Sequence, residues 1–295
     1  MLLFTGCKKD HTLNCISLPS TTNPTGWNYV IDSDFSESPC FDPNNANEFV
    51  FIKHFNGISA LCTFNTQTNS LFQLYTGSIF GRPDWGLNDW ILFNVSNDIY
   101  KIKKNGDSLT RLTTGGISIG GKWVPNQDKY TYSLFPGSGY NGIVVASSSG
   151  KVIDSFSIAL GDTSVSLDTT FIVVNASNAN AGFIVYGGRH QIPKLINCKI
   201  DIATYSGACY INSLEFIWAD KSGLYITNIQ TGQTIKIKEN CNSIAYLLPN
   251  YSSLSNRVIL GKTVKSFVNS STLKVSKAIV LMNPDGTAEQ EINIH

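Results

Sequence analysis

The feature that most constrains this chain is the regular spacing of its tight turns. Turns with Gly, Asn or a polar pair at the tip lie between apolar segments and are centred near residues 69, 106, 150, 191, 232 and 286. Gly and Asn suit such tips because they tolerate the positive φ of a tight hairpin. The period of about forty residues is that of a four-stranded propeller blade.

The segments between these turns have the length and composition of β-strands. Apolar runs such as residues 90–95 and 224–229 are bounded by Gly, Asn, Asp or Ser, which is typical strand punctuation. Only 15% of the residues are charged, and the remaining polarity comes from Ser, Thr and Asn, which favour turns and strands over helix surfaces. We therefore predict an all-β fold.

A second repeated element precedes a strand in most units. Copies of it occupy residues 41–44, 82–89, 122–128, 165–168 and 247–250. The best-kept unit, residues 83–113, reads Pro-Asp-Trp, then Ile-Leu-Phe, Ile-Tyr-Lys-Ile, Asn-Gly-Asp and Leu-Thr. This pattern resembles the TolB-type propeller repeat. The resemblance spans residues 40–295 and implies a six-bladed β-propeller of four-stranded antiparallel blades that binds a partner protein.

The apolar faces of the predicted strands favour a closed ring of blades. One thin sheet cannot cover its own apolar faces, whereas blades stacked around an axis cover one another. Trp85 and Trp123 are predicted to pack between neighbouring blades, and residues 27–31 form a plausible extra or closing strand. The blades are placed at residues 40–77, 78–116, 117–161, 162–203, 204–241 and 242–295.

The amino terminus resembles the end of a bacterial lipoprotein signal peptide. Thr5, Gly6 and Cys7 match the last three positions of a lipobox, and the polar segment that follows resembles the start of many Bacteroidetes lipoproteins. We interpret residues 1–6 as the remnant of a signal peptide and residues 7–39 as a lipidated tether. The resemblance implies an outer-membrane lipoprotein attached only through a lipid on Cys7; the alternative is a chance Gly-Cys pair.

The seven cysteines allow two interpretations. Setting Cys7 aside leaves six, which fits disulfides formed in an oxidising compartment. Two disulfides could then form, Cys15 with Cys40 and Cys198 with Cys209. The second pair flanks a turn. The remaining cysteines are Cys62 and Cys241. The other interpretation, held equally, is that several are free thiols that pack as small apolar residues.

The sequence offers little support for catalysis. Residues 116–120 read Gly-x-Ser-x-Gly around Ser118, but a strand follows where a nucleophile elbow needs a helix. His11 and His295 have a second metal-ligating residue nearby, but both lie at chain ends. We expect no catalytic residue, no cofactor and no metal. The net charge of +1, without a basic stripe, indicates no nucleic-acid partner.

Several aspartates recur with the repeat. Asp84, Asp89, Asp128 and Asp168 are predicted to form turns, because Asp side chains bond nearby backbone N–H groups. Catalytic groups, by contrast, should break the repeat. A carboxylate pair across the axial funnel stays the alternative, which would suit glycosidase or lyase chemistry.

Two functions follow as expectations. The first is a non-enzymatic scaffold that binds another envelope protein through its loops. The second is a carbohydrate-binding or glycan-processing propeller with its site in the axial funnel. The candidate partner contacts are Lys262, Lys265, Phe267 and Lys274 on an inserted hairpin tip at residues 262–276, and Tyr140 in the turn at 137–141.

Overall fold

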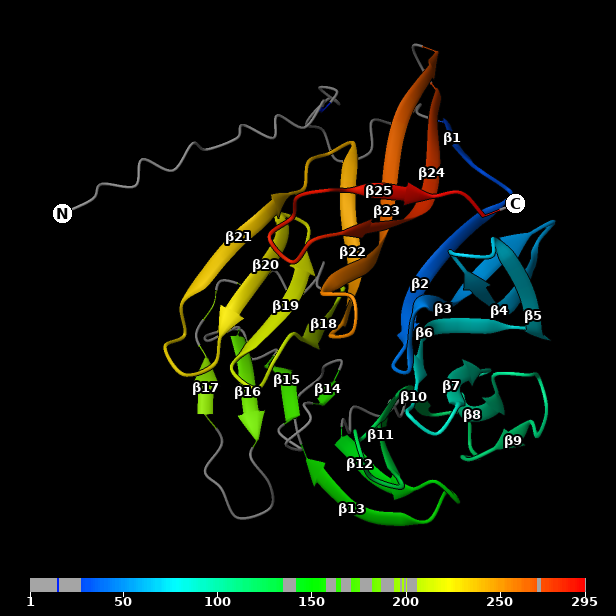
Figure 1. Cartoon of the computed structure of the whole chain (residues 1–295), viewed down its shortest axis with the longest axis vertical. Helices are drawn as coiled ribbons and strands as arrows, with labels where there is room; N and C mark the ends of the chain where they lie inside the picture. The colour runs from blue at the N-terminus through cyan, green and yellow to red at the C-terminus, as the bar shows by residue number, and fades with distance from the viewer. Residues whose placement is uncertain are drawn as a thin grey trace.

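The structure is a computed structural model that describes residues 15, 28–134, 142–157, 163–165, 171–175, 182–186, 194–196, 198, 200, 206–269 and 272–294. These residues form six β-sheets arranged around an axis (Figure 1), five of them four-stranded and one five-stranded. The predicted all-β propeller with four-stranded antiparallel blades is confirmed. Within these ranges, no helix has the length and apolar character needed to span a membrane.

Each blade uses its strands in chain order, from an inner strand beside the axis to an outer strand at the rim. Blades 1 to 3 contain β2 (Phe35–Asp42), β3 (Asn45–Phe55), β4 (Ile58–Asn65), β5 (Ser70–Thr76), β6 (Ile79–Trp85), β7 (Trp90–Val95), β8 (Asp98–Lys103), β9 (Thr110–Arg111), β10 (Ser118–Trp123), β11 (Lys129–Leu134), β12 (Gly142–Ser147) and β13 (Val152–Ser157). Blades 4 to 6 contain β14 (Thr163–Val165), β15 (Phe171–Asn175), β16 (Gly182–Tyr186), β17 (Lys194–Ile196), β18 (Gly207–Tyr210), β19 (Glu215–Asp220), β20 (Gly223–Asn228), β21 (Thr234–Glu239), β22 (Ile244–Ser252), β23 (Arg257–Asn269), β24 (Thr272–Met282) and β25 (Gln290–Ile292).

The hydrophobic core lies between the blades. In β7, Ile91 and Phe93 face blade 1, whereas Leu92 faces blade 3. All three side chains are at most 1% exposed, because successive residues of a strand point to opposite faces and both faces are covered. The central strands therefore have nearly continuous apolar runs, whereas the rim strand β5 is largely exposed.

Every apolar cluster among the described residues joins two neighbouring blades. Trp85 packs in the cluster between blades 1 and 2, and Trp123 in the cluster between blades 2 and 3, which confirms their predicted position. Gly86 shows how close this packing is, since a Cβ there would lie 2.8 Å from the Trp123 ring.

The ring closes by packing between blades 1 and 6. Phe49 and Phe51 of blade 1 share a buried cluster with Ile259 and Ile279 of blade 6. All four strands of blade 1 come from residues 35–76, and β22 to β25 supply a complete four-stranded blade 6. In the residues that the structure describes, these two blades thus share no strand. Side-chain packing therefore joins blades 1 and 6, and we call such a boundary between two neighbouring blades a seam.

The predicted N-terminal strand is present as an addition to blade 6. Strand β1 (Asn28–Ile31) pairs in parallel with residues 272–275 of β24, while β25 pairs with residues 279–281 of the same strand. Asp32 extends the pairing through its backbone N–H to Val275 O, at 3.1 Å. Residues 28–39, which the sequence analysis placed in the tether, therefore contribute β1 and the first part of β2.

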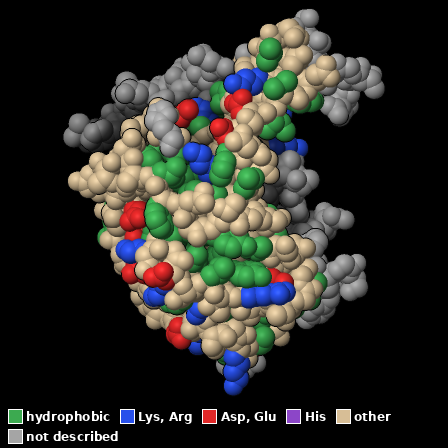
Figure 2. Space-filling model, turned by 90° about the vertical axis from the view of Figure 1, so that its right-hand side faces the viewer, with side chains coloured by type: hydrophobic (Ala, Val, Ile, Leu, Met, Phe, Trp, Pro, Cys, Tyr) green, Lys and Arg blue, Asp and Glu red, His purple; other side chains and the backbone are tan. Residues whose placement is uncertain are grey.

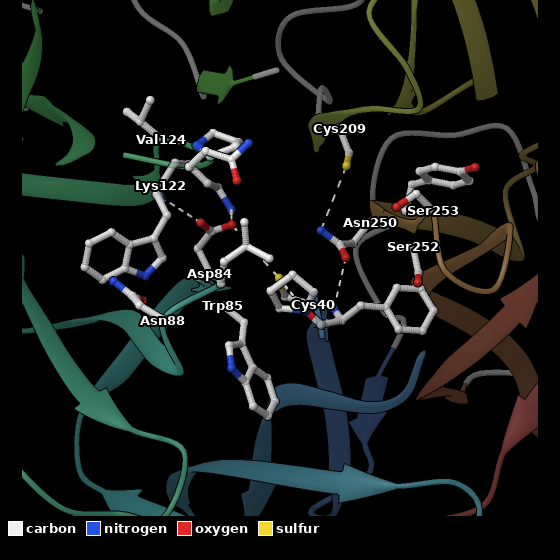
Figure 3. A pocket seen from close by; sticks show the side chains of 18 of the residues that line it. Cys40, Asp84, Trp85, Asn88, Lys122, Val124, Cys209, Asn250, Ser252 and Ser253 are labelled. Atoms are coloured by element: carbon white, nitrogen blue, oxygen red, sulfur yellow. Dashed lines mark hydrogen bonds and ion pairs between the residues drawn. The ribbon is translucent and has the colours of Figure 1, made fainter. Parts of the chain in front are cut away.

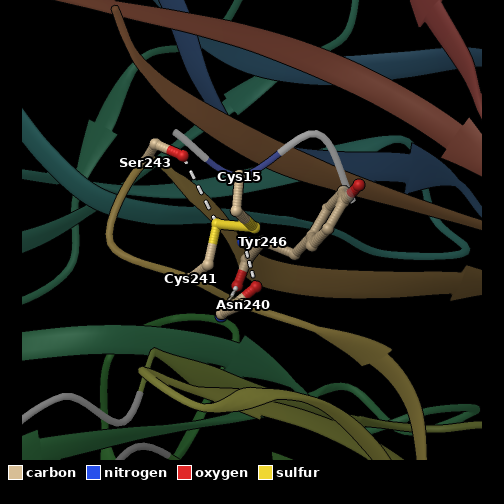
Figure 4. The surroundings of a disulfide bond; sticks show 5 residues. All are labelled: Cys15, Asn240, Cys241, Ser243 and Tyr246. Atoms are coloured by element: carbon tan, nitrogen blue, oxygen red, sulfur yellow. Dashed lines mark hydrogen bonds between the residues drawn. A yellow bond between two sulfur atoms is a disulfide. The ribbon is translucent and has the colours of Figure 1, made fainter. Parts of the chain in front are cut away.

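A disulfide joins the N-terminal segment to the ring. Cys15 is bonded to Cys241, in the connection between β21 and β22 (Figure 4). The expected Cys15–Cys40 pair is wrong, because Cys40 is buried on the inner strand β2. The expected Cys198–Cys209 pair is also wrong: Cys198 follows the rim strand of blade 4, whereas Cys209 lies on the inner strand of blade 5. Together with Cys62 these cysteines are free, as the alternative interpretation held.

Strands β23 and β24 are unusually long. The pairing of β23 with β22 ends where Val264 opposes Ile244, but β23 and β24 continue as a hairpin, with β1 paired along residues 272–275 (Figure 1). We call residues 265–269 and 272–275 the arm. The arm explains why the last interval between turns is longer than forty residues.

Candidate functional site

A cavity of about 600 Å³ opens at the side of the ring where the inner strands end (Figure 3). We call this side the cavity side, and the opposite side, where the inner strands begin, the start side. The mouth is built by the turns that follow four inner strands, and it is lined there by Pro43 and by residues 86–88, 124–128 and 252–253. These turns include the repeated element seen in the sequence.

Five residues, one from each described inner strand of blades 1, 2, 3, 5 and 6, line the inner part of the cavity. We call them the axial ring: Cys40, Asp84, Lys122, Cys209 and Asn250. Each is followed by an aromatic residue that pairs with the second strand of its blade, namely Phe41, Trp85, Trp123, Tyr210 and Tyr251. In four of these strands a β-bulge precedes the ring residue, and bulges re-aim side chains in this way.

The axial ring bonds one blade to the next. The backbone N–H of Trp123 donates to the Asp84 carboxylate at 2.7 Å, from blade 3 to blade 2. The backbone N–H of Phe41 donates to Asn250 Oδ1 at 3.0 Å, from blade 1 to blade 6. The hydrogen bond from Phe41 to Asn250, between the first and last blades, is thus of the same kind as the bond from Trp123 to Asp84, between blades 2 and 3.

The two ring thiols take the same acceptor role. Cys40 accepts from the backbone N–H of Trp85 in blade 2, and Cys209 from that of Tyr251 in blade 6. In addition, Asn250 Nδ2 lies 3.9 Å from Cys209 Sγ (Figure 3). Four seams of the ring are therefore bridged by one repeated contact, made by three different kinds of side chain.

Two cations lie among these groups. Lys122 Nζ is 3.3 Å from Asp84 Oδ1, and the side chains are only 7% and 17% exposed. Arg82, from blade 2, donates to Pro249 O of blade 6 at 2.6 Å and to Ala208 O of blade 5 at 3.3 Å. The guanidinium thus crosses the axis and ties three blades together at the inner end of the cavity.

The environment of the ring thiols makes them poor nucleophiles. Burial raises the pKa of Cys40 to about 12, and the nearby Asp84 carboxylate adds to this against the opposing effect of Lys122 and Arg82. Burial also raises the pKa of Cys209. Since the thiolate is the reactive form, these cysteines serve as packing and hydrogen-bonding groups.

We expect the four free cysteines among the described residues to resist alkylation in the folded protein. With pKa values of about 12 for Cys40 and about 11 for Cys62 and Cys198, at most about one thiol in a thousand is ionised at pH 8. Mass-spectrometric mapping after iodoacetamide treatment should find them unmodified in buffer and fully modified in denaturant. Rapid labelling of Cys40 in the folded state would contradict the buried ring.

The structure of a putative TolB from Agrobacterium tumefaciens superposes with a TM-score of 0.62 at 13% identity, covering 77% of this chain and 86% of that one. The chain has a TolB-like β-propeller fold. TolB from Acinetobacter baumannii superposes with a TM-score of 0.51 at 14% identity, covering 84% and 77% of the two chains.

Other matches are as distant in sequence. The propeller domain of the Trilobed protease from Pyrococcus furiosus, described as having an open velcro topology, superposes with a TM-score of 0.57 at 9% identity and covers 90% of this chain and 97% of that domain. No protein-family model matches the sequence, and no curated protein matches it either. Identities this low establish the fold alone.

The TolB-like propeller places the recurring aspartates differently from one another. Asp89 and Asp128 lie in the turns after β6 and β10, as predicted. The prediction for Asp84 is wrong: it lies within β6, and its carboxylate bonds to blade 3. Asp168 lies outside the described residues. Ser118 begins β10 and is only 2% exposed, in keeping with the absence of a nucleophile elbow.

The predicted partner contacts fall in two places. Lys265, Phe267 and Lys274 lie on the arm. Lys262 lies at its base, where its Nζ is 2.7 Å from Glu289 Oε1 in a largely covered ion pair. Tyr140 and Cys7 lie outside the described residues. Among those that are described, no three His, Cys, Asp or Glu side chains are arranged to hold a metal.

Sequence reasoning missed Arg82, Lys122 and Asn250. One signal was present: Asp84-Trp85 and Lys122-Trp123 place opposite charges before the same aromatic in neighbouring repeats. Equivalent positions of adjacent blades lie side by side around the axis, so such a pair predicts an ion pair across a seam. Nothing comparable marks Arg82, whose acceptors are backbone carbonyl groups far away in the chain.

Proposed function

We propose that this chain is a non-enzymatic envelope protein whose TolB-like propeller binds a partner protein at the mouth of the axial cavity. The mouth presents backbone, amide and hydroxyl groups from the turns of four blades, together with the exposed side chain of Leu87. Turns held on a rigid scaffold are typical recognition surfaces. A mixed polar and apolar rim suits a protein segment.

The bonding of the polar groups inside the cavity favours binding over catalysis. The polar groups deepest in the cavity are already engaged: Asp84 with Lys122 and Trp123, and Asn250 with Phe41. A general acid or base has to exchange protons with a substrate, whereas these groups hold the blades together. The polar side chains at the inner end of the cavity thus hold the blades together, and the mouth is left as a surface for binding.

The same geometry argues against the glycan alternative. Sugars stack on open aromatic faces, but Trp85 and Trp123 are only 5% and 6% exposed because both pack between blades. Of the two carboxylates that line the cavity, Asp84 is held by Lys122 and Asp128 lies on the exposed rim. We therefore favour a protein partner.

The location that fits this function is the bacterial envelope, with the chain anchored to the outer membrane through a lipid on Cys7. The support is the lipobox-like Thr5-Gly6-Cys7 and the Cys15–Cys241 disulfide. Disulfides persist in oxidising compartments such as the periplasm and the cell surface. Mass spectrometry of the N-terminal peptide from native membranes tests the anchor, and an unmodified Cys7 would refute it.

Binding at the mouth is tested by a matched pair of surface variants. Leu87→Arg combined with Gln127→Arg places two large cations on exposed mouth positions, whereas Phe72→Arg changes a 51% exposed residue on the rim strand β5. Partners captured from envelope extracts by the tagged protein are quantified by mass spectrometry. We expect the mouth variant, and not the rim variant, to lose a specific protein at least tenfold. Equal capture by all three forms would refute the proposal.

A further inference from the structure

We infer that the start side of the propeller lies against a lipid bilayer, with the arm and β1 in contact with lipid headgroups and the cavity opening away from the membrane. This inference rests on the lipid anchor included in the proposed function. It adds an orientation and a second membrane contact, and it comes from the positions of the disulfide, β1 and the arm.

The disulfide limits how far the ring can stand from its anchor. Cys15 is bonded to Cys241, which lies in the connection from the rim of blade 5 to the inner strand of blade 6 on the start side. Cys7 and Cys15 are eight residues apart, a separation of at most about 28 Å in a fully extended chain. The next described residue along the chain is Asn28, 21 residues from Cys7. The bond therefore brings the start side close to the lipid.

The arm and β1 expose the kind of side chains that suit a bilayer interface. Phe267 and Val268 near the arm tip are 44% and 59% exposed, and Tyr29, Val30 and Ile31 of β1 are 46% to 59% exposed. Figure 2 shows hydrophobic, basic and acidic side chains close together on the projecting part at the top of the molecule. Clustered apolar groups of this kind mark interaction sites, and aromatic and Lys side chains suit the polar headgroup region.

The charges of the same region are balanced, so the apolar side chains are what suit a lipid surface. Lys265 and Lys274 lie on the arm, Asp32 is 3.0 Å from Lys274, and Asp34 is exposed just after β1. An acyl chain binds stably when a second signal of apolar or basic groups accompanies it. The arm supplies that second signal at the point where the tether reaches the ring.

Strand direction places the cavity on the opposite side. β22 begins at Ile244, beside the base of the arm, and ends at Ser252, which lines the cavity. Nine residues of strand span about 30 Å. A protein held by its start side thus presents the mouth, and the partner bound there, to the aqueous compartment.

The experiment uses the full-length lipidated protein in vesicles of phosphatidylethanolamine and phosphatidylglycerol at a ratio of about 3:1, which mimics an anionic bacterial bilayer. An environment-sensitive fluorophore is attached at Val268→Cys on the arm or, as the matched control, at Ser253→Cys on the exposed mouth. The parent protein reports background labelling, which the buried thiols keep low. We expect a blue-shifted emission and several-fold stronger quenching by spin-labelled lipids at position 268 than at position 253.

The outcomes separate the anchor from the orientation. An unmodified Cys7 overturns the anchor and this inference but leaves partner binding at the mouth untouched. A lipidated protein with position 268 in water, or with position 253 quenched, overturns the orientation alone. A label at 268 that is shielded without lipid quenching, in a protein that sediments as a dimer, assigns the arm to a second copy of the chain and also overturns it.

Discussion

Removal of the Cys15–Cys241 disulfide should lower the free energy of unfolding by about 3–5 kcal/mol. The bond closes a loop with a sequence separation of 226 residues, so it restricts the unfolded chain strongly. It also holds the segment that leads to β1 and blade 1. Because Cys241 lies just before β22, the bond links the N-terminal segment covalently to the start of blade 6.

The measurement is chemical denaturation of the wild type and of a Cys15→Ser, Cys241→Ser double variant, each with and without dithiothreitol. The reductant should lower the stability of the wild type to that of the variant and leave the variant unchanged. Cys62→Ser serves as the control for a buried cysteine outside the disulfide. A wild type whose stability is insensitive to the reductant under conditions where mass spectrometry shows Cys15 and Cys241 reduced would contradict the role of this bond.

Asp84→Ala should be about as destabilising, by roughly 3–5 kcal/mol. The substitution leaves the Lys122 ammonium, whose side chain is only 7% exposed, without its carboxylate partner. It also removes the acceptor of the Trp123 N–H. A buried charge without a partner and an unsatisfied backbone donor are each costly.

Two companion variants identify the cause. Asp84→Asn keeps an oxygen for the Trp123 N–H and loses the charge, so its loss of stability should fall between those of the wild type and Asp84→Ala. Asp128→Ala removes an exposed carboxylate from the same cavity and should change stability by less than about 0.5 kcal/mol. If thermal and urea denaturation rank Asp128→Ala with Asp84→Ala, the seam contact is not the reason for the effect.

The ring of blades could be predicted from the sequence because its causes are local and repeated. Turn residues recur about every forty positions, and segments such as residues 90–95 are apolar on both faces, which only a strand covered from both sides tolerates. The strand at residues 28–31 was likewise visible as an apolar run. Its parallel pairing with β24 was not, because the partner lies at the other end of the chain.

The site could be predicted only in part, because its contacts join distant residues. Phe41 and Asn250 are 209 residues apart, and Arg82 and Pro249 are 167 apart. The recurrence of aspartate in the repeat also led to a wrong prediction for Asp84. Asp84 and Asp128 both follow the repeat, but a bulge turns Asp84 toward the axis, whereas Asp128 lies in a turn. The sequence does not indicate which cysteines pair, so only the arrangement of the blades shows that Cys241 faces the N-terminal segment.

The most direct test of the closed ring is amide hydrogen exchange at Phe41. Its N–H crosses the seam to Asn250 Oδ1, just as the Trp123 N–H crosses to Asp84. In protein labelled with ¹⁵N at Phe and Trp, both amides should exchange slowly, and Asn250→Ala should accelerate exchange at Phe41 while leaving Trp123 protected. Fast exchange at Phe41 in the wild type, at the rate of an exposed loop, would contradict a ring that closes between blades 1 and 6.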